Sequence, residues 1–574
     1  MIKTLLPYLK KYKLFAILAP LTVILEVLLE VSIPRIMAGI IDIGIAQQDM
    51  NYIVKMGMLM ILMAILSLVF GGLSARFAAV AGTGFSKEVR KAIFGKIQDF
   101  SFSNIDKFST ASLITRITTD TNNTQNAVMI SLRLLVRAPI MFICAIFMAF
   151  SINSSLTFIF AIAVPILIIS LVLIIKNAFV RFQKMLKQYD NLNSTVQENI
   201  IGIRTVKAFV RETFENEKFR KIAGNVRDAQ ASAERVLNFM MPTMQFVMYG
   251  CMIAIFWFGG NMIILGNMLT GELMSFISYV TQILMSLMML SMAFVQLSIS
   301  RASVERIAEV INEEPEIRNN NNPLKNIPNG SVEFENAYFS YNENAEEYIL
   351  EDINIHINSG ESIGIIGGTG SGKTTLVQLI PRLYDVHKGK VKVGGIDVKD
   401  YDLEALRESV SMVLQKNVLF SGTIKENLRW GDKNATDEEI IEACKAAQAH
   451  DFIMSFPNGY DTWIEQGGVN LSGGQKQRLC IARALIKKPK IIILDDSTSA
   501  VDTATDSAIR AALRKNLRDM TSIIIAQRIS SIMDCDKIFV MNDGKIETEG
   551  NHETLMEKSE VYREIYHSQM KEEA

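Results

Sequence analysis

Six long runs of apolar residues fill much of the first half of this 574-residue chain. They lie near residues 14–45, 55–81, 125–152, 155–177, 236–266 and 271–298. A helix needs about 20 predominantly apolar residues to cross roughly 30 Å of hydrocarbon, and each run is long enough to do so. The mean hydropathy of the whole chain, +0.22, is also high for a soluble protein. The sequence therefore predicts a polytopic membrane protein with six transmembrane helices.

The distribution of basic residues predicts the orientation of these helices. Lys and Arg are retained on the cytoplasmic side of short loops. Four lysines precede residue 14, whereas the loops near residues 47–52, 153–155 and 267–272 contain neither Lys nor Arg. The connections near residues 82–124 and 178–235 are long, charged and helical in period, so we expect the helices to continue through them into the cytoplasm. This pattern predicts a multi-pass protein of the cell (inner) membrane with both termini in the cytoplasm.

A change of composition marks the end of the membrane domain. Residues 312–330, NEEPEIRNNNNPLKNIPNG, are rich in Asn and Pro and lack an apolar period, which is typical of a linker. From residue 331 to residue 574, short β-rich runs such as SIGIIG and KIIILDD alternate with helical stretches. This alternation favours an α/β sheet of the nucleotide-binding type. We therefore predict a transmembrane domain over 1–311, a linker over 312–330 and an α/β nucleotide-binding domain over 331–574.

Charge and cysteine content exclude two classes of site. The chain has 59 Lys and Arg against 60 Asp and Glu, a net charge of −1, so it lacks the basic excess that nucleic-acid binding requires. We expect no nucleic-acid partner. The five cysteines are scattered without a CxxC spacing, so the sequence indicates neither a zinc site nor a disulfide framework.

A glycine-rich motif predicts where a nucleotide binds. GGTGSGKTT follows the strand-like run SIGII and precedes the helical stretch TTLVQLIPRLY, which is the context that a P-loop requires. Backbone N–H groups of such a loop surround phosphate oxygens, the lysine reaches the β- and γ-phosphates, and the following hydroxyl can ligate Mg²⁺. We therefore assign ATP binding to Gly367, Gly368, Thr369, Gly370, Ser371, Gly372, Lys373, Thr374 and Thr375.

The apolar run IIILDD supplies the second half of this site. Its first carboxylate, Asp495, ends a predicted buried strand and would hold Mg²⁺ directly or through water. An apolar strand that ends in two acids is weak evidence alone, but about 120 residues after a P-loop it becomes strong. The sequence predicts ATP and Mg²⁺ as the cofactors.

The stretch LSGGQKQR, residues 471–478, resembles the signature motif of ATP-binding cassette (ABC) proteins. This resemblance implies that Tyr341 stacks on adenine and that Gln415 is the Q-loop glutamine, which contacts the metal. It also implies that residues 499–502, SAVD, form the D-loop with Asp502. Six spans and the cytoplasmic stretches 102–116 and 197–212, expected to carry coupling helices, resemble one ABC exporter half-transporter of the type IV fold.

In that family two cassettes face each other head to tail, so the resemblance implies a dimer. The signature residues Ser472, Gly473, Gly474 and Gln475 would then act on ATP held by the P-loop of the partner.

Two positions depart from the family pattern. The family usually has glutamate where this chain has Asp496, and histidine where it has Gln527. Shortening the carboxylate withdraws it by about 1 Å from the water that it must position, and losing such a base costs on the order of 10²- to 10⁴-fold in rate. Gln527 can donate a hydrogen bond but cannot exchange a proton at neutral pH. We expect this site to bind ATP tightly and hydrolyse it slowly, although Asp496 could still act through the metal or a second water.

An intact signature beside a weakened hydrolytic site resembles the degenerate subunit of a bacterial heterodimeric exporter. The expected partner is a second half-transporter that keeps its catalytic Glu and His. The resemblance implies export of amphipathic drugs or lipids from the cytoplasm or the inner leaflet by alternating access. Two alternatives remain open: a homodimer that hydrolyses ATP slowly, and a nucleotide-gated regulator or channel-like protein. An importer is disfavoured because the cassette is fused behind six spans.

Polar residues inside spans are costly and therefore candidates for a substrate path. Glu26 and Glu30 lie at i and i+4 before Pro34, where they could meet a cationic substrate. They could equally pair with Arg133 or Arg137, or lie in water at the outer edge; we favour a structural role. Further candidates for the path, on spans five and six, are Tyr249, Tyr279, Gln282 and Phe294.

Overall fold

The computed structural model describes residues 2–342, 347–496, 503–516 and 520–572. The chain divides into two compact units, which we call the helical unit and the sheet unit. The helical unit comprises Met1–Gln98 and Ala111–Glu313, and the sheet unit comprises Asp99–Thr110 and Glu314–Ala574. Each unit is described by itself below.

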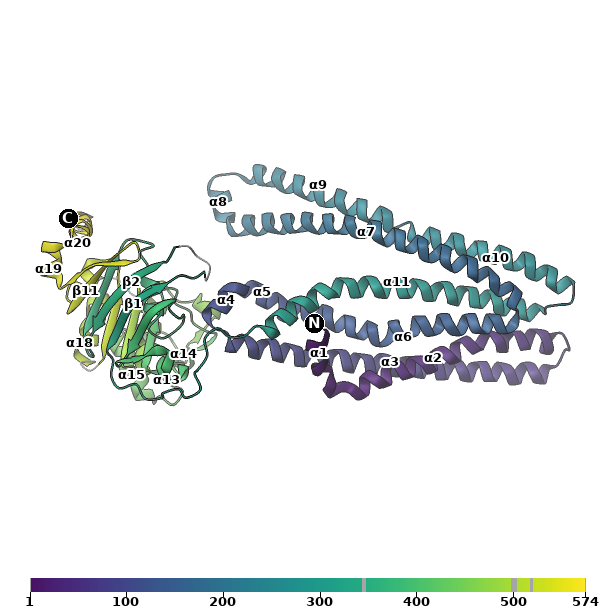
Figure 1. Cartoon of the computed structure of the whole chain (residues 1–574), viewed down its shortest axis with the longest axis horizontal. Helices are drawn as coiled ribbons and strands as arrows, with labels where there is room; N and C mark the ends of the chain where they lie inside the picture. The colour runs from purple at the N-terminus through teal and green to yellow at the C-terminus, as the bar shows by residue number, and fades with distance from the viewer. Residues whose placement is uncertain (1, 343–346, 497–502, 517–519, 573–574) are drawn as a thin grey trace. The chain divides into compact units, whose positions relative to one another are not determined.

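Long helices make up the helical unit (Figure 1). They are α1 (Ile2–Leu9), α2 (Lys13–Gly39), α3 (Met50–Asp99), α6 (Thr121–Ile152), α7 (Ser154–Ile201), α9 (Glu212–Leu237), α10 (Met240–Ile264) and α11 (Thr270–Asn312), with the short α5 (Thr110–Thr115) and α8 (Ile203–Ala208). Among the residues that the structure describes, six helical stretches are long and apolar enough to cross a membrane, as the sequence predicts. The 50 residues of α3 and the 48 of α7 exceed what a bilayer requires, so both helices continue beyond it.

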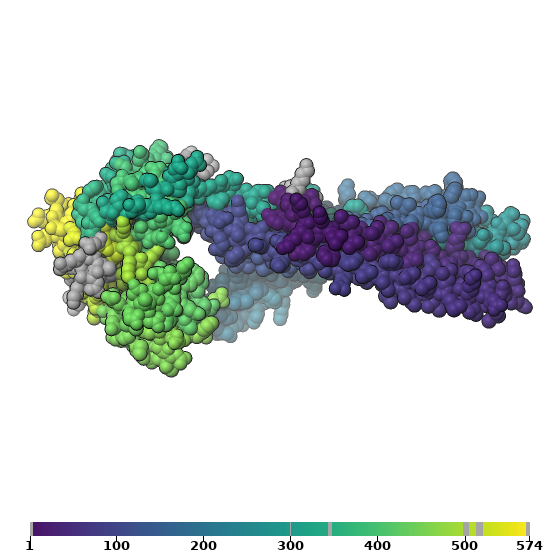
Figure 2. Space-filling model, turned by 90° about the horizontal axis from the view of Figure 1, so that it is seen from below, coloured from purple at the N-terminus to yellow at the C-terminus, as the bar shows by residue number. Residues whose placement is uncertain are grey.

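Apolar side chains of the helical unit pack on the inside and also cover much of its outside. Val27 of α2, Ile255 of α10 and Phe276 of α11 are fully buried in one core, where Phe276 stacks on Phe160 with a centroid distance of 5.5 Å. By contrast, 76 % of Leu68 on α3 is exposed. The N-terminal helices lie on the face of this unit that Figure 2 shows. An apolar exterior of this kind is stable against lipid or another apolar surface and not in water, which agrees with a membrane location.

The main sheet of the second unit has six strands in the order β12-β11-β3-β10-β9-β6. The strands are β3 (Ser362–Gly367), β6 (Val410–Val413), β9 (Ile491–Asp495), β10 (Thr521–Ile525), β11 (Lys537–Asn542) and β12 (Lys545–Gly550). All neighbours pair in parallel except β12, which runs antiparallel to β11 at one edge. Because β3, β9 and β10 are parallel neighbours, their carboxyl ends meet at one edge of the sheet, which brings Gly367, Asp495 and the residues after Ile525 together.

Two smaller sheets and several helices complete this unit. The antiparallel sheet β2-β1-β4-β5 consists of β1 (Val332–Phe339), β2 (Leu350–Ile357), β4 (Lys388–Val393) and β5 (Ile396–Asp397), and β7 (Gly422–Thr423) pairs with β8 (Trp463–Ile464). The helices are α4 (Phe102–Phe108), α12 (Lys373–Gln378), α13 (Leu403–Ser409), α14 (Ile424–Leu428), α15 (Asp437–Ala446), α16 (His450–Met454), α17 (Gly473–Ile486), α18 (Thr503–Asn516), α19 (His552–Lys558) and α20 (Glu560–Glu572). Helix α12 ends at Gln378 and is shorter than the stretch TTLVQLIPRLY suggests; Pro381, which lacks a backbone N–H and disfavours further helix, follows its end.

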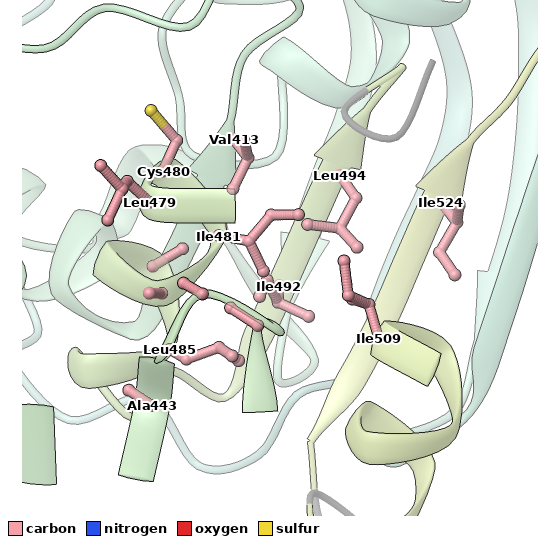
Figure 3. Packing of buried hydrophobic residues seen from close by; sticks show 14 of the residues in the cluster. Val413, Ala443, Leu479, Cys480, Ile481, Leu485, Ile492, Leu494, Ile509 and Ile524 are labelled. Atoms are coloured by element: carbon pink, nitrogen blue, oxygen red, sulfur yellow. The ribbon is translucent and has the colours of Figure 1, made fainter. Parts of the chain in front are cut away.

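Helix α17 is held against the main sheet by aliphatic side chains. In Figure 3, Ile481 of α17 points toward Ile492 and Leu494 of β9, and Ile509 of α18 lies beside the same strand. These four side chains are at most 1 % exposed. Burying each one stabilises the fold by about 1.5–3 kcal/mol. The packing therefore fixes α17, and with it the predicted signature, relative to β9.

The predicted linker packs onto the sheet unit. Helix α11 ends at Asn312, and Leu324 then forms a parallel bridge with Tyr401. Ile327 is only 3 % exposed, and the Asn319 side-chain oxygen accepts a hydrogen bond from the Leu403 N–H. Most of this Asn- and Pro-rich segment is thus part of the sheet unit rather than a loose connection.

Candidate nucleotide-binding site

The predicted P-loop lies between β3 and α12. Gly370 and Gly372 have φ values of 87° and 90°, which only glycine adopts without strain. A Cβ atom on Gly367 would come within 2.1 Å of the Met541 carbonyl oxygen, so this position also requires glycine. The Lys373 ammonium donates hydrogen bonds to the carbonyl oxygens of Gly367 at 3.0 Å and Gly368 at 2.7 Å. The loop therefore curves around the lysine, as a phosphate cradle requires.

Thr374 and Asp495 form the adjoining half of the site. The Thr374 hydroxyl donates to Asp495 Oδ1 at 3.0 Å. Asp495 is 1 % exposed, and its Oδ2 atom has no hydrogen-bond partner among the described residues. Burial raises the pKa of Asp495 and lowers the pKa of Lys373, because both charged forms are desolvated. A hydroxyl beside a buried carboxylate oxygen without a partner is the kind of oxygen donor set that Mg²⁺ prefers, so these residues fit the metal.

The Asp496 carboxylate accepts hydrogen bonds from two side-chain amides. The Gln527 side-chain amide donates to Asp496 Oδ2 at 2.9 Å, and the Gln415 amide donates to the same oxygen at 3.4 Å. The backbone of Asp496 adopts a left-handed φ of 48°, and its N–H donates to the Ile525 carbonyl oxygen. Burial raises the pKa of Asp496 above its ordinary value. The structure thus brings Gln415, Asp496 and Gln527 together, with a neutral amide where the family has histidine.

Tyr341 lies next to the P-loop helix. Its hydroxyl is 3.0 Å from Thr375 Oγ1, and its ring meets those of Phe339 and Tyr384 edge to face at 5.0 and 5.2 Å. The Tyr341 side chain is held in place by these contacts, yet 49 % of the residue is exposed. An aromatic ring held in this way can stack on a flat base such as adenine.

Helix α4 reaches the same aromatic group, a contact that the sequence analysis missed. Tyr384 donates a hydrogen bond to Asp106 Oδ2 of α4 at 2.7 Å, and Phe102 contacts the Tyr384 ring edge to face at 6.0 Å. Asn104 of α4 accepts a hydrogen bond from the Glu316 N–H. Of the stretch 102–116 that the sequence analysis singled out, α4 is the part that lies in the sheet unit. Tyr384 therefore connects α4 to Tyr341.

The signature residues begin α17. Ser472 is its N-cap: the Ser472 hydroxyl accepts from the Gln475 N–H, and the Gln475 side chain accepts from the Ser472 N–H at 2.9 Å. Ser472 and Gly473 are exposed. Gln477, which the sequence did not single out, is 1 % exposed and donates to the Asp496 carbonyl oxygen at 3.3 Å. The D-loop residue Asp502 lies outside the described residues.

The candidates for a substrate path separate into two groups. Arg137 donates to Glu26 at 2.5 Å and to Glu30 at 2.6 Å. Of the alternatives that the sequence leaves open for these two acids, the structure contains the ion pair with Arg137. Tyr279 is fully buried and donates to the Val31 carbonyl oxygen at 2.9 Å, so it packs α11 against α2 instead of lining a path. Tyr249 and Phe294 are exposed and Gln282 is half-buried, and their role in a path stays a prediction.

Comparison with known proteins identifies the family of this chain. A family described as the ABC transporter transmembrane region matches residues 16–287, and a second, described as ABC transporter, matches residues 350–499. An uncharacterized ABC transporter ATP-binding protein of Bacillus subtilis, YfiB, is 38 % identical over 98 % of both chains. The chain belongs to the ABC transporter family. Six apolar helices fused to a C-terminal nucleotide-binding domain, as predicted, are therefore confirmed.

Further relatives connect this ABC transporter to exporters. YgaD of Bacillus subtilis, a putative multidrug export ATP-binding/permease protein, is 34 % identical over 83 % of each chain. The ATP-dependent lipid A-core flippase of Syntrophus aciditrophicus is 33 % identical, over 88 % of this chain and 84 % of that protein. The structure of a bacterial Atm1-family ABC exporter with ATP bound matches with a TM-score of 0.84 and 25 % identity, covering 98 % of this chain and 99 % of that one. This ABC transporter thus has the fold of that exporter and is a multi-pass membrane protein.

Proposed function

We propose that the chain is one half of an ATP-driven exporter of amphipathic drugs or lipids. The observation that carries this proposal is the convergence of the P-loop, Asp495, Asp496 and Gln415 at one edge of a sheet that is fused to six apolar helices. The fold likeness to an ATP-bound exporter and the printed functions of YgaD and the lipid A-core flippase support the direction of transport and the class of substrate. The protein lies in the cell membrane with the sheet unit in the cytoplasm.

Different residues of this chain contact the different parts of the nucleotide. The P-loop and Lys373 bind the phosphates, and Tyr341 stacks on the base. Thr374 and Asp495 would hold Mg²⁺, with Gln415 nearby, and the metal would neutralise phosphate charge. Asp496 is in the position that orients the attacking water, but it is one methylene short and already accepts from two amides. We therefore expect this site to hold bound ATP for a long time and to hydrolyse it slowly.

The active unit is a dimer in which the second chain differs from this one. Ser472 and Gly473, at the start of α17, are exposed, so they are open to a second cassette. Beside α8, Phe209 and Val210 are 74 % and 79 % exposed, which favours a further partner contact because such side chains are costly in water. A partner that keeps the catalytic Glu and His would supply the hydrolytic site that the signature of this chain completes.

A transport assay in proteoliposomes tests the exporter proposal. The full-length chain, with and without a half-transporter that keeps Glu and His, is compared with its Lys373→Ala variant, using a fluorescent amphipathic dye as probe. The proposal predicts ATP-dependent accumulation of the dye against its gradient, lost in Lys373→Ala. Equilibration of the dye without accumulation, opened by ATP, would instead support a nucleotide-gated channel.

A further inference from the structure

The last described helix, α20 (Figure 1), contacts the loop that carries Gln527. The Gln569 side-chain amide donates to the Gln527 carbonyl oxygen at 2.7 Å. The side-chain oxygen of the same residue accepts from the Ile529 N–H at 2.9 Å. One side chain thus bonds the backbone on both sides of Arg528, at Gln527 and Ile529, which lie 42 and 40 residues before Gln569 in the sequence.

Helix α20 is itself firmly attached to the sheet unit. Tyr562 is fully buried, and its hydroxyl is 2.8 Å from His552 Nδ1 of α19. Val561, Ile565 and Tyr566 pack against the core that also contains β9 and α17. Because this packing fixes α20, the position of Gln569 relative to the sheet is fixed as well.

The side chain of Gln527 depends on this support. Gln527 is exposed, so packing does not select its rotamer, yet its amide must stay within 2.9 Å of Asp496 Oδ2. We propose that Gln569 is a positioning residue for the ATP site: it holds the backbone of Gln527 so that the Gln527 amide stays against Asp496. This inference rests on the proposed function of that site. A glutamine suits the task because one planar amide offers both a donor and an acceptor.

A double-mutant cycle in the full-length protein, reconstituted in lipid nanodiscs, tests this role. Gln569→Leu removes both hydrogen bonds at nearly constant size, and Ser568→Ala, an exposed neighbour on α20, is the matched control. The readout is the dissociation rate of Mg-ATP, with the melting temperature recorded in parallel. We expect Gln569→Leu to raise this rate roughly threefold to tenfold, the effect of one net hydrogen bond, with Ser568→Ala unchanged.

The decisive comparison uses the Gln527→Ala background. If Gln569 acts through Gln527, Gln569→Leu has no further effect on dissociation there. An equal rise in both backgrounds, or no rise in the native background, would overturn the proposal, because the role of Gln569 would then be structural or absent.

Hydrogen exchange separates this inference from the proposed function. Without nucleotide, Gln569→Leu should speed exchange at the Ile529 amide relative to Ser568→Ala, and unchanged exchange would refute the contact itself. If Gln569→Leu speeds exchange but the native protein does not retain Mg-ATP, the proposed function is refuted, whereas the contact of Gln569 with the Gln527 loop is confirmed.

Discussion

In the helical unit, several acids have cationic partners. Arg137 forms ion pairs with Glu26 and Glu30. Arg306 and Ser303 both bind the buried Asp120. In the sheet unit, Asp495 is equally buried, but its described hydrogen-bond partner is the neutral Thr374 hydroxyl. Among the described residues, no Lys or Arg forms an ion pair with Asp495; Lys373 acts on it only across a longer distance. A buried charge with a counter-charge supports the fold, whereas one without is costly unless a ligand supplies the counter-charge.

This difference separates the two groups of acids by function. Glu26 and Glu30, which the sequence alone would allow to bind a cationic substrate, already form ion pairs with Arg137. Glu26 Oε2 and Asp495 Oδ2 both lack a hydrogen-bond partner among the described residues, but the Glu26 carboxylate is already in an ion pair with Arg137, whereas Asp495 has only the Thr374 hydroxyl. We therefore expect substitutions in the first group to reduce stability and substitutions in the second to reduce ligand binding.

The largest effect is expected from Arg137→Ala, which leaves Glu26 and Glu30 without their cation in the membrane. Breaking such a pair by removing one partner costs about 3 kcal/mol in unfolding free energy. Thermal unfolding of the detergent-solubilised protein measures this loss. The triple variant Arg137→Ala, Glu26→Gln, Glu30→Gln is the control and should recover most of it. An unchanged melting temperature of Arg137→Ala would show that the ion pairs do not contribute to the stability of the fold.

Asp495→Asn should weaken the binding of Mg-ATP without lowering thermal stability. Replacing the carboxylate by an amide removes a charged Mg²⁺ ligand, for which we expect a loss of about 100-fold in Mg-dependent ATP affinity. The melting temperature should hold or rise, because the desolvated charge is gone. Isothermal titration calorimetry of ATP with and without Mg²⁺ measures the effect. A large fall in melting temperature with unchanged affinity would place Asp495 among the structural acids.

The smallest effect concerns pH. Burial raises the pKa of Asp495 and of Asp496, so each takes up a proton at a higher pH than an ordinary aspartate does. The folded state then binds protons more readily than the unfolded one, and the cost of burying these charges, present at neutral pH, is relieved as pH falls through the raised pKa. Mg-ATP affinity should weaken over the same range, and Asp495→Asn should flatten that dependence. A native pH profile identical to that of Asp495→Asn would contradict this assignment.

Contiguous motifs account for most of what the sequence predicts. The P-loop, the run ending in Asp495 and the apolar spans are local patterns, and the structure places them on β3, β9 and the long helices. The contacts that the sequence analysis missed join distant positions: Asp106 with Tyr384 is separated by 278 residues, and Gln569 with Gln527 by 42. Nothing in the local pattern of Gln569 or Tyr384 distinguishes it from a surface residue. The partner of Glu26 is likewise fixed only when α2 and α6 pack.

The central claim is that Asp496 marks a site that retains ATP rather than turning it over. ATP hydrolysis by the purified chain, alone and together with a half-transporter that keeps Glu and His, tests it most directly. The account predicts little activity alone and robust activity of the pair, abolished by replacing the partner glutamate and unaffected by Asp496→Asn. Comparable activity of the chain alone, lost in Asp496→Asn, would show that Asp496 is a working base in a slow homodimer and would contradict the account.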